Sequence, residues 1–164
     1  MSQLEHLSPI TNHPFAQAND CAIDISNMTT VQYTQVSGPV GVMYMQGGIS
    51  HATIVPGAGK RVVTSGEAGL DLTTGKLVTS SLEAQIHAAF ELLDCVLKGA
   101  GVGKGVGGAY KITALVLDMA NEQHLMRAFN ELYPGHRPTF MTFAVAGLAL
   151  EGMEVELQAE ALIE

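Results

Sequence analysis

The side chains best suited to chemistry form a polar stripe near the C-terminus. From Met153 to Leu162 apolar and polar residues alternate, which predicts a strand with Glu154, Glu156, Gln158 and Glu160 on one face. A carboxylate in a partly dry cleft can hold and deprotonate water. A polar strand face is more often simply solvated. The pattern alone therefore nominates Glu156 without assigning it a role.

A second group of polar residues lies between positions 51 and 67. Ser65 could present a hydroxyl at a strand end, but no Asp/His pair with a recognisable local signature and no G-x-S-x-G elbow accompanies it. His51 and Glu67 are consistent with surface polar residues near a turn. The six histidines never pair at i,i+4 or lie beside a cysteine, so we predict no metal site and no cofactor.

The glycine-rich segment 103–108 satisfies G-x-G-x-x-G literally. It follows a predicted helix and precedes a predicted strand, whereas a dinucleotide fingerprint must follow a strand and open a helix. Position 98 is Lys rather than Gly, so the phosphate-binding P-loop spacing fails as well. The segment is interpreted as a flexible loop.

The elements that must position these residues follow from periodicity. Ser80 to Glu83 has the form of a capping box, and the apolar spacing after it predicts a helix that ends at Gly99. A second helix is predicted over 121–133. β-Branched and alternating segments predict strands over 30–36, 42–45, 52–55, 61–65, 111–119, 140–148 and 153–162.

This order predicts an α+β fold in which two helices pack on one face of a mixed sheet. Residues 1–28 lack periodicity and are expected to be an irregular N-terminal arm, with one domain over 29–164. Phe140, Thr142 and Ala144 share a strand parity, so we expect a partly apolar sheet face that association into a homo-oligomer would bury.

Composition limits the function classes. With 47 % hydrophobic and 15 % charged residues the chain can build one core, and a net charge of -8 disfavours nucleic acid and anionic membrane surfaces as partners. Cys21 and Cys95 suggest no disulfide framework, and no 18-residue apolar stretch or leader-like segment opens the chain. We expect a cytoplasmic protein.

Several segments, taken in order, resemble the Rid (YjgF-like) family over residues 49–164. Ser65-Gly66-Glu67-Ala68-Gly69 is similar to the family's S-G-Q-x-G, and Asp71 to Leu77 to its D-x-x-T-G-x-l. Further similarities are Ser50-His51-Ala52, Glu83-Ala84-Gln85, Tyr110-Lys111-Ile112-Thr113, His136-Arg137-Pro138 and Val155-Glu156-Leu157-Gln158-Ala159. The resemblance implies a chorismate-mutase-like fold and a homotrimer with small-molecule clefts between subunits.

The resemblance also implies roles for single residues. In deaminating members an arginine two residues after the family proline, here Pro138, clamps the substrate carboxylate, and a glutamate on the last strand positions the attacking water. The glutamate corresponds to Glu156, but the arginine position is Phe140. Arg137 has the opposite strand parity and is expected to point away from the cleft.

Other positions of the implied cleft are retained only in part. Thr142 keeps a small polar group and is a catalytic candidate together with Glu156, whereas Ile49 replaces a tyrosine of the cleft wall. The remaining substrate-binding candidates are Phe140, His51, Ser65, Gly66, Glu67 and Asn130, the last by an alignment that needs a shift. The losses predict an apolar pocket suited to a larger, less charged ligand.

Three functions stay open. The leading hypothesis is an enzyme that uses Glu156 as general acid/base to tautomerise, cyclise or hydrolyse an enamine, imine or enol, in specialised metabolism. The alternatives are the archetypal 2-imino acid deaminase and a trimeric ligand-binding protein without catalysis.

Overall fold

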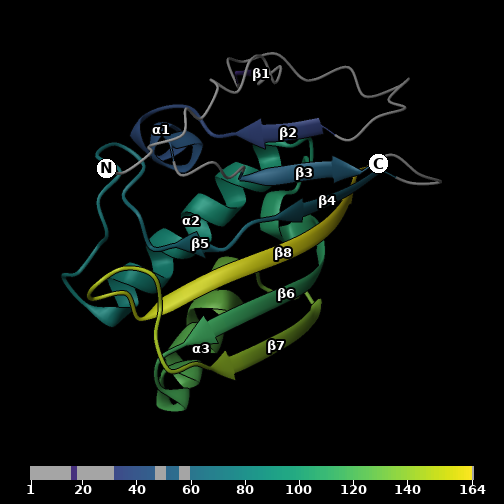
Figure 1. Ribbon diagram of the computed structural model, residues 1–164. Helices are drawn as coiled ribbons and strands as arrows, with labels where there is room; N and C mark the ends of the chain where they lie inside the picture. The colour runs from purple at the N-terminus through teal and green to yellow at the C-terminus, as the bar shows by residue number, and fades with distance from the viewer. Residues whose placement is uncertain (1–15, 18–31, 47–50, 56–59, 164) are drawn as a thin grey trace, which may run out of the picture.

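The computed structural model describes residues 16–17, 32–46, 51–55 and 60–163. Its sheet has the strand order β1-β2-β3-β4-β8-β6-β7, with β5 paired to β8 beyond the end of β4 (Figure 1). The strands are β1 (Ala16–Gln17), β2 (Gln32–Gln35), β3 (Ala52–Val55), β4 (Lys60–Thr64), β5 (Glu67–Ala68), β6 (Ala109–Val116), β7 (Thr139–Ala144) and β8 (Val155–Ile163).

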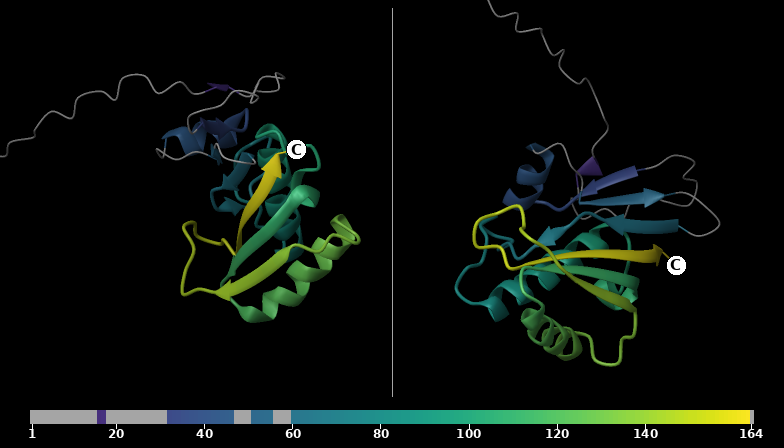
Figure 2. Two further views of the ribbon diagram at one scale, coloured as in Figure 1. Left: turned by 90° about the vertical axis from the view of Figure 1, so that its right-hand side faces the viewer. Right: turned by 60° about the horizontal axis from the view of Figure 1, so that its bottom comes forward.

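Two helices cover one face of this sheet, as Figures 1 and 2 show: α2 (Leu82–Gly99) and α3 (Glu122–Leu132). A third helix, α1 (Pro39–Gln46), lies near β2 at the other end of the molecule. The mixed α+β architecture expected from the sequence is therefore confirmed, with one more helix than predicted.

The long helix α2 forms where its sequence favours it. Ser81 caps its first turn by accepting a hydrogen bond from the Ala84 N–H, and Gly101 follows its end at φ +94°. Ser80 was predicted as the capping residue, so the cap lies one residue later. The apolar stripe is buried against the sheet and includes Ile86, Phe90, Leu93 and Leu97.

Alternate residues of strand β8 lie on opposite faces of the sheet. Its residues Val155, Leu157, Ala159 and Ala161 are buried toward the helices, while Glu156 and Glu160 are half-buried on the other face. The alternation predicted for this strand is confirmed. We call the face that α2 and α3 leave uncovered the open face.

One predicted strand is wrong. Residues 42–45 lie in α1, because Pro39 begins a helix in which Val40 and Tyr44, four residues apart, are both buried. Val42 and Met43 are exposed between them. The β-branched composition favoured a strand, but the four-residue spacing was the better guide.

Candidate functional site

A hollow on the open face contains the main candidate residue. Its volume is about 200 Å³, and it is lined by Gly66, Thr113, Leu115, Glu156, Leu157 and Gln158. Glu156 on β8 pairs with Leu115 on β6, and on its other side with Ala68 on β5. The carboxylate lies against the backbone of Gly66, since a Cβ added there would be 1.7 Å from Glu156 Oε1.

Glu156 differs from the other members of its polar stripe. Glu160 accepts from Lys111 Nζ at 2.8 Å and from the Tyr110 hydroxyl at 2.7 Å. Gln158 donates to the Thr64 carbonyl, and Glu154 accepts from Asn121. Among the described residues no hydrogen bond or ion pair holds the Glu156 carboxylate. It is the member of the stripe left available for a ligand.

The surroundings of Glu156 favour its neutral form. Burial raises the pKa of this carboxyl above its usual value, and no cation among the described residues opposes the shift. A carboxyl whose pKa is raised holds a proton more readily, and it can both accept and return one. The arrangement is suited to general acid/base chemistry.

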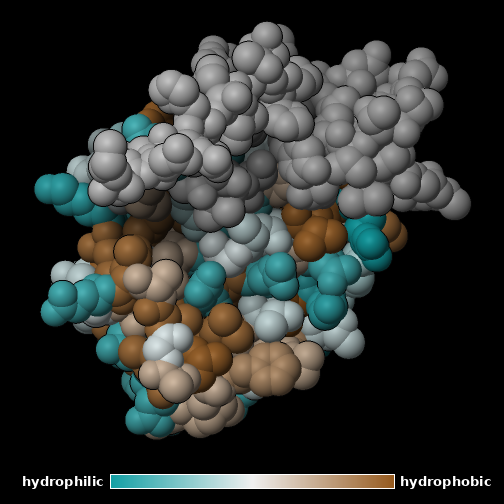
Figure 3. Space-filling view, viewed as in Figure 1, coloured by the Kyte–Doolittle hydropathy of each residue, from teal (hydrophilic) through white to brown (hydrophobic). Residues whose placement is uncertain are grey.

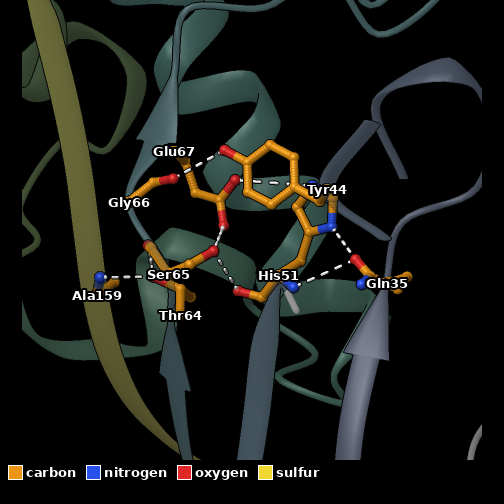
Figure 4. Close-up of polar contacts among 8 residues, drawn as sticks. All are labelled: Gln35, Tyr44, His51, Thr64, Ser65, Gly66, Glu67 and Ala159. Atoms are coloured by element: carbon orange, nitrogen blue, oxygen red, sulfur yellow. Dashed lines mark hydrogen bonds and ion pairs between the residues drawn. The ribbon is translucent and has the colours of Figure 1, made fainter. Parts of the chain in front are cut away.

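Behind Gly66, on the helix-covered side, a buried polar cluster fills the space between α1, β3 and β5 (Figure 4). The Tyr44 ring stacks on the His51 ring with centroids 3.8 Å apart and planes 16° apart. The Tyr44 hydroxyl donates to the Gly66 carbonyl at 2.8 Å. The cluster thus supports the backbone on which Glu156 rests.

Glu67 is the acid of this cluster. Its side chain is fully buried, and its Oε1 accepts from the Ser65 hydroxyl at 3.1 Å. Burial raises its pKa well above the usual value, and the charge of Glu156 adds to the rise. Burial also lowers the pKa of His51 to about 4. His51 is therefore neutral near pH 7, and burial favours the protonated form of Glu67.

His51 and Glu67 do not lie where the sequence suggested. We expected polar residues at a turn that could touch a substrate, but both side chains have no exposed surface. The reason is strand parity: Glu67 pairs with Leu157 and shares its helix-covered side. Of the predicted residues, Glu156 and Gly66 meet at the hollow, with Ser65 adjoining Gly66.

Phe140 and Thr142 lie on the opposite face from Glu156 of the same chain. On β7 they pair with the buried Ile112 and Ala114 of β6, and Phe140 packs edge-on against Phe129 of α3 with ring centroids 5.2 Å apart. The expectation that Phe140, Thr142 and Ala144 form the apolar part of the open face is therefore wrong. The prediction that these three residues share one face of the strand is correct, but that face is the helix-covered one and not the open face.

The apolar part of the open face comes from the alternate residues of β7. Met141 and Phe143 are 48 % and 46 % exposed, on the same side as Thr113 and Leu115 of β6. Figure 3, which views this side, shows hydrophobic residues beside hydrophilic ones across it. The open face is thus mixed in character, as expected, but through different residues.

The remaining candidates lie elsewhere. Asn130 is exposed on α3, where its side chain donates to the Met126 carbonyl at 2.7 Å. Arg137 is exposed and donates to the His136 carbonyl. Ile49 and Cys21 are outside the described residues.

Sequence reasoning missed Tyr44, Gln35, Thr113 and Leu115 as parts of the site. The helical spacing of Val40 and Tyr44 could have placed Tyr44 against the core. The others come to the site through strand pairing, which the sequence does not display. Within the described ranges no group of three His, Cys, Asp or Glu side chains is arranged to hold a metal, and no helix could cross a membrane.

Comparison with known proteins agrees with this fold. The family model described as Endoribonuclease L-PSP matches residues 44–163. No curated protein shows a significant sequence match. An L-PSP-type protein from Entamoeba histolytica is 30 % identical over 70 % of this chain and 86 % of its own, with a TM-score of 0.62.

Two further solved structures share the fold. One, from Yersinia pestis, is described as a member of the conserved Rid family and is 24 % identical over 71 % of this chain and 89 % of its own, at TM-score 0.64. The other, TdcF from E. coli with bound serine, is 20 % identical over 79 % and 92 %, at TM-score 0.61. The chain belongs to the YjgF/Rid family, whose family model carries the description Endoribonuclease L-PSP.

Proposed function

We propose that this protein is a Rid-like enzyme that moves protons on a reactive enamine, imine or enol, with Glu156 as the general acid/base. The observation that carries the proposal is the state of Glu156. It is half-buried, its pKa is raised, and it lines a hollow without a hydrogen bond or ion pair from any described residue.

The chemistry follows from one carboxyl group. For tautomerisation, the Glu156 carboxylate accepts a proton from the substrate carbon or nitrogen, and the resulting acid returns a proton to the other atom of the conjugated system. For hydrolysis, the carboxylate accepts a proton from water as the water oxygen bonds to the carbon of a protonated imine, and the C=N π electrons move to nitrogen. The acid then gives its proton to that nitrogen, and the carboxylate accepts the carbinol O–H proton as the C=O bond forms and the C–N bond breaks to release the amine.

The lining of the hollow favours a substrate of low charge. Leu115 and Leu157 are apolar, Thr113 offers a hydroxyl, and no Lys or Arg is among the described residues that line the hollow. We infer that a full cleft forms in a homotrimer, because Met141 and Phe143 on the same face would otherwise remain in water. Such a cleft would bring Met141 or Phe143 of one subunit toward Glu156 of its neighbour.

The archetypal deaminase is the second candidate. TdcF, a neighbour in fold, is described with bound serine, so this fold accommodates a ligand of amino-acid size. Here, however, the clamp position is Phe140, packed against Phe129, and Arg137 is exposed and bonded to its neighbour's carbonyl. A short 2-imino acid would lack the guanidinium fork that binds its carboxylate.

RNA cleavage, which the family description mentions, is not what the surface favours. The open face carries Glu156 and Glu160, and the whole chain has a net charge of -8. Both repel a phosphate backbone.

The test is Glu156→Gln, with Glu154→Gln as a matched control on the same polar stripe. Substrates are a short 2-imino acid and an aryl-substituted enamine, each generated in situ, and NMR follows deuterium uptake from solvent and ammonia release. We expect turnover of the aryl enamine to fall by about 10²–10⁴-fold in Glu156→Gln only. Equal rates in both variants contradict the role of Glu156. Binding without turnover in the native protein favours the non-catalytic alternative.

A further inference from the structure

The buried cluster behind the hollow contains two titratable groups for which the proposed function gives no task. Glu67 and His51 have no exposed surface, and His51 Nε2 and Glu67 Oε2 have no hydrogen-bond partner among the described residues. Two buried polar atoms without hydrogen bonds destabilise the folded state. Whether these two can bond to each other depends on which of them carries a proton.

The tautomer of His51 follows from its contact with Gln35. The His51 backbone N–H donates to Gln35 Oε1 at 3.3 Å, which identifies that atom as the oxygen, because an amide nitrogen would not accept. His51 Nδ1 faces the same oxygen at 2.5 Å. A carbonyl oxygen only accepts, so Nδ1 carries the hydrogen. In neutral His51, Nε2 is therefore an unprotonated acceptor.

The acceptor Nε2 faces the Glu67 carboxyl. Glu67 Oε2 lies 3.8 Å away, which is beyond hydrogen-bond length but within reach of a small side-chain movement. An ionised Glu67 would present a second acceptor to Nε2, which satisfies neither atom. A protonated Glu67 can donate its O–H to Nε2 and satisfy both.

The other groups around Glu67 agree with a protonated acid. Tyr44 approaches from α1, Cys95 from α2, Glu156 from β8 and Ser65 from two residues earlier in the chain, and none of them is a cation. Among the described residues, a negative charge on Glu67 would thus have only hydroxyl donors and no counter-charge in a dry environment.

We propose that Glu67 and His51 share one proton and that this buried pair is a positioning group that keeps Glu156 ionisable as a base. The family pattern has glutamine at position 67, so the acid is a departure that adds a titratable proton to this site. This inference rests on the proposed function only for its effect on rate.

The backbone of Gly66 lies between Glu67 and Glu156 and explains how the charge of one affects the other. Gly66 contacts the Glu156 carboxylate on the open face, while its carbonyl accepts from Tyr44 on the helix-covered side. If the shared proton is lost, the charge on Glu67 lies across one strand from Glu156, in a region of low dielectric. That charge makes a second negative charge on Glu156 less favourable.

The first experiment measures protonation without activity. Infrared spectra of native protein and Glu67→Gln at neutral pH are compared for the carbonyl band of a protonated carboxyl, and ¹⁵N NMR reports which ring nitrogen of His51 carries hydrogen. We expect the band to disappear in Glu67→Gln, and Nδ1 to be protonated in the native protein. An ionised Glu67 at neutral pH overturns the inference.

The second experiment measures the link to Glu156. Carboxyl ¹³C NMR follows the titrations of Glu156 and Glu67 in native protein, Glu67→Gln, Glu156→Gln and the control Glu154→Gln. We expect Glu156 to titrate in Glu67→Gln as it does in the native protein, because position 67 is neutral in both while Glu156 ionises. We expect Glu67 to lose its proton at lower pH in Glu156→Gln than in the native protein, because the charge on Glu156 is then absent. Unchanged Glu67 titration in Glu156→Gln overturns the link.

The outcomes separate the two proposals. If Glu156→Gln retains full turnover, the proposed function fails while the infrared and NMR results still decide the shared proton. If Glu156→Gln is inactive but Glu67 titrates in that variant as in the native protein, only the positioning role is lost.

Discussion

The Glu156 carboxylate rests on the backbone of Gly66 so closely that a Cβ at position 66 would lie 1.7 Å from Oε1 and 2.6 Å from Cδ. The φ angle of Gly66 is not in the left-handed region, so backbone conformation does not require glycine here. Glycine is needed because the Glu156 carboxylate occupies the space that a Cβ would take. The contact joins two segments 90 residues apart in sequence and fixes where the candidate acid/base lies.

Gly66→Ala tests this contact. The clashing atoms are the end of a flexible side chain, so we expect Glu156 to swing away at a stability cost of about 1 kcal/mol or less, with turnover reduced about 10²-fold. Chemical denaturation and steady-state kinetics measure the two effects. Gly147→Ala is the control, because a Cβ there meets nothing within 4 Å. Equal kinetics in both variants would show that the contact is unimportant.

Gln85 is a second position where one side chain holds the framework together. It is 2 % exposed; its Nε2 donates to the carbonyls of Val78 and Gly152 at 2.8 and 3.0 Å, and its Oε1 accepts from the Glu154 N–H at 2.6 Å. Gln85→Ala removes the side-chain partner of three partly buried backbone groups, two of which, in Gly152 and Glu154, lie just before β8 begins.

We expect Gln85→Ala to lower the free energy of unfolding by about 3 kcal/mol. Urea denaturation measures this against Gln123→Ala on the exposed side of α3, for which we expect a change within about 0.5 kcal/mol. A loss below 1 kcal/mol in Gln85→Ala would mean that water replaces the side chain.

The elements of the fold that were predicted correctly are those with a clear local sequence pattern. The alternation along β8 placed Glu156 on the uncovered face, and the spacing from Ile86 to Leu97 located α2. Parity along β7 was also visible, but which parity faces α3 depends on the pairing of Ile112 with Phe140 across strands separated by a helix. That register is a property of tertiary packing.

The site itself was predictable only in part. Gly66 and Glu156 were found through family resemblance, yet their contact was not, because it joins β8 to the bend after β4. His51 and Glu67 looked like surface residues, since charged side chains are rarely buried without a partner. Their burial depends on each other and on Gln35, Tyr44 and Ser65, a combination that no local pattern encodes.

The exposed apolar residues of the open face make a prediction about assembly. Phe143 is 46 % exposed on this face, and Leu132 is 41 % exposed at the end of α3 on the helix-covered side. If subunits pair through the open face, Phe143→Asp should yield monomers and Leu132→Asp should leave the oligomer intact. Light scattering after gel filtration measures both. A monomeric native protein, or an oligomer that survives Phe143→Asp, contradicts the proposed cleft between subunits.

Buried Glu67 makes the stability depend on pH with a definite sign. Its folded pKa lies above the ordinary value of 4.5, so between these two values the folded protein keeps a proton that the unfolded chain has lost. The contribution of Glu67 to the free energy of unfolding is fully present below about pH 4.5. It falls as the pH rises toward the folded pKa, by up to about 1.4 kcal/mol per pH unit.

Glu67→Gln has no such proton, so its stability relative to the native protein should increase steadily above about pH 5. Urea denaturation at intervals from pH 5 to pH 9 measures the difference, with Glu131→Gln on the exposed side of α3 as the control for loss of a carboxylate. His51, whose pKa is lowered to about 4, acts in the opposite direction, since its contribution is lost as pH falls below about 6.5. A difference between Glu67→Gln and native protein that stays constant with pH would mean that Glu67 is ionised in the folded state, with a counter-charge outside the described residues.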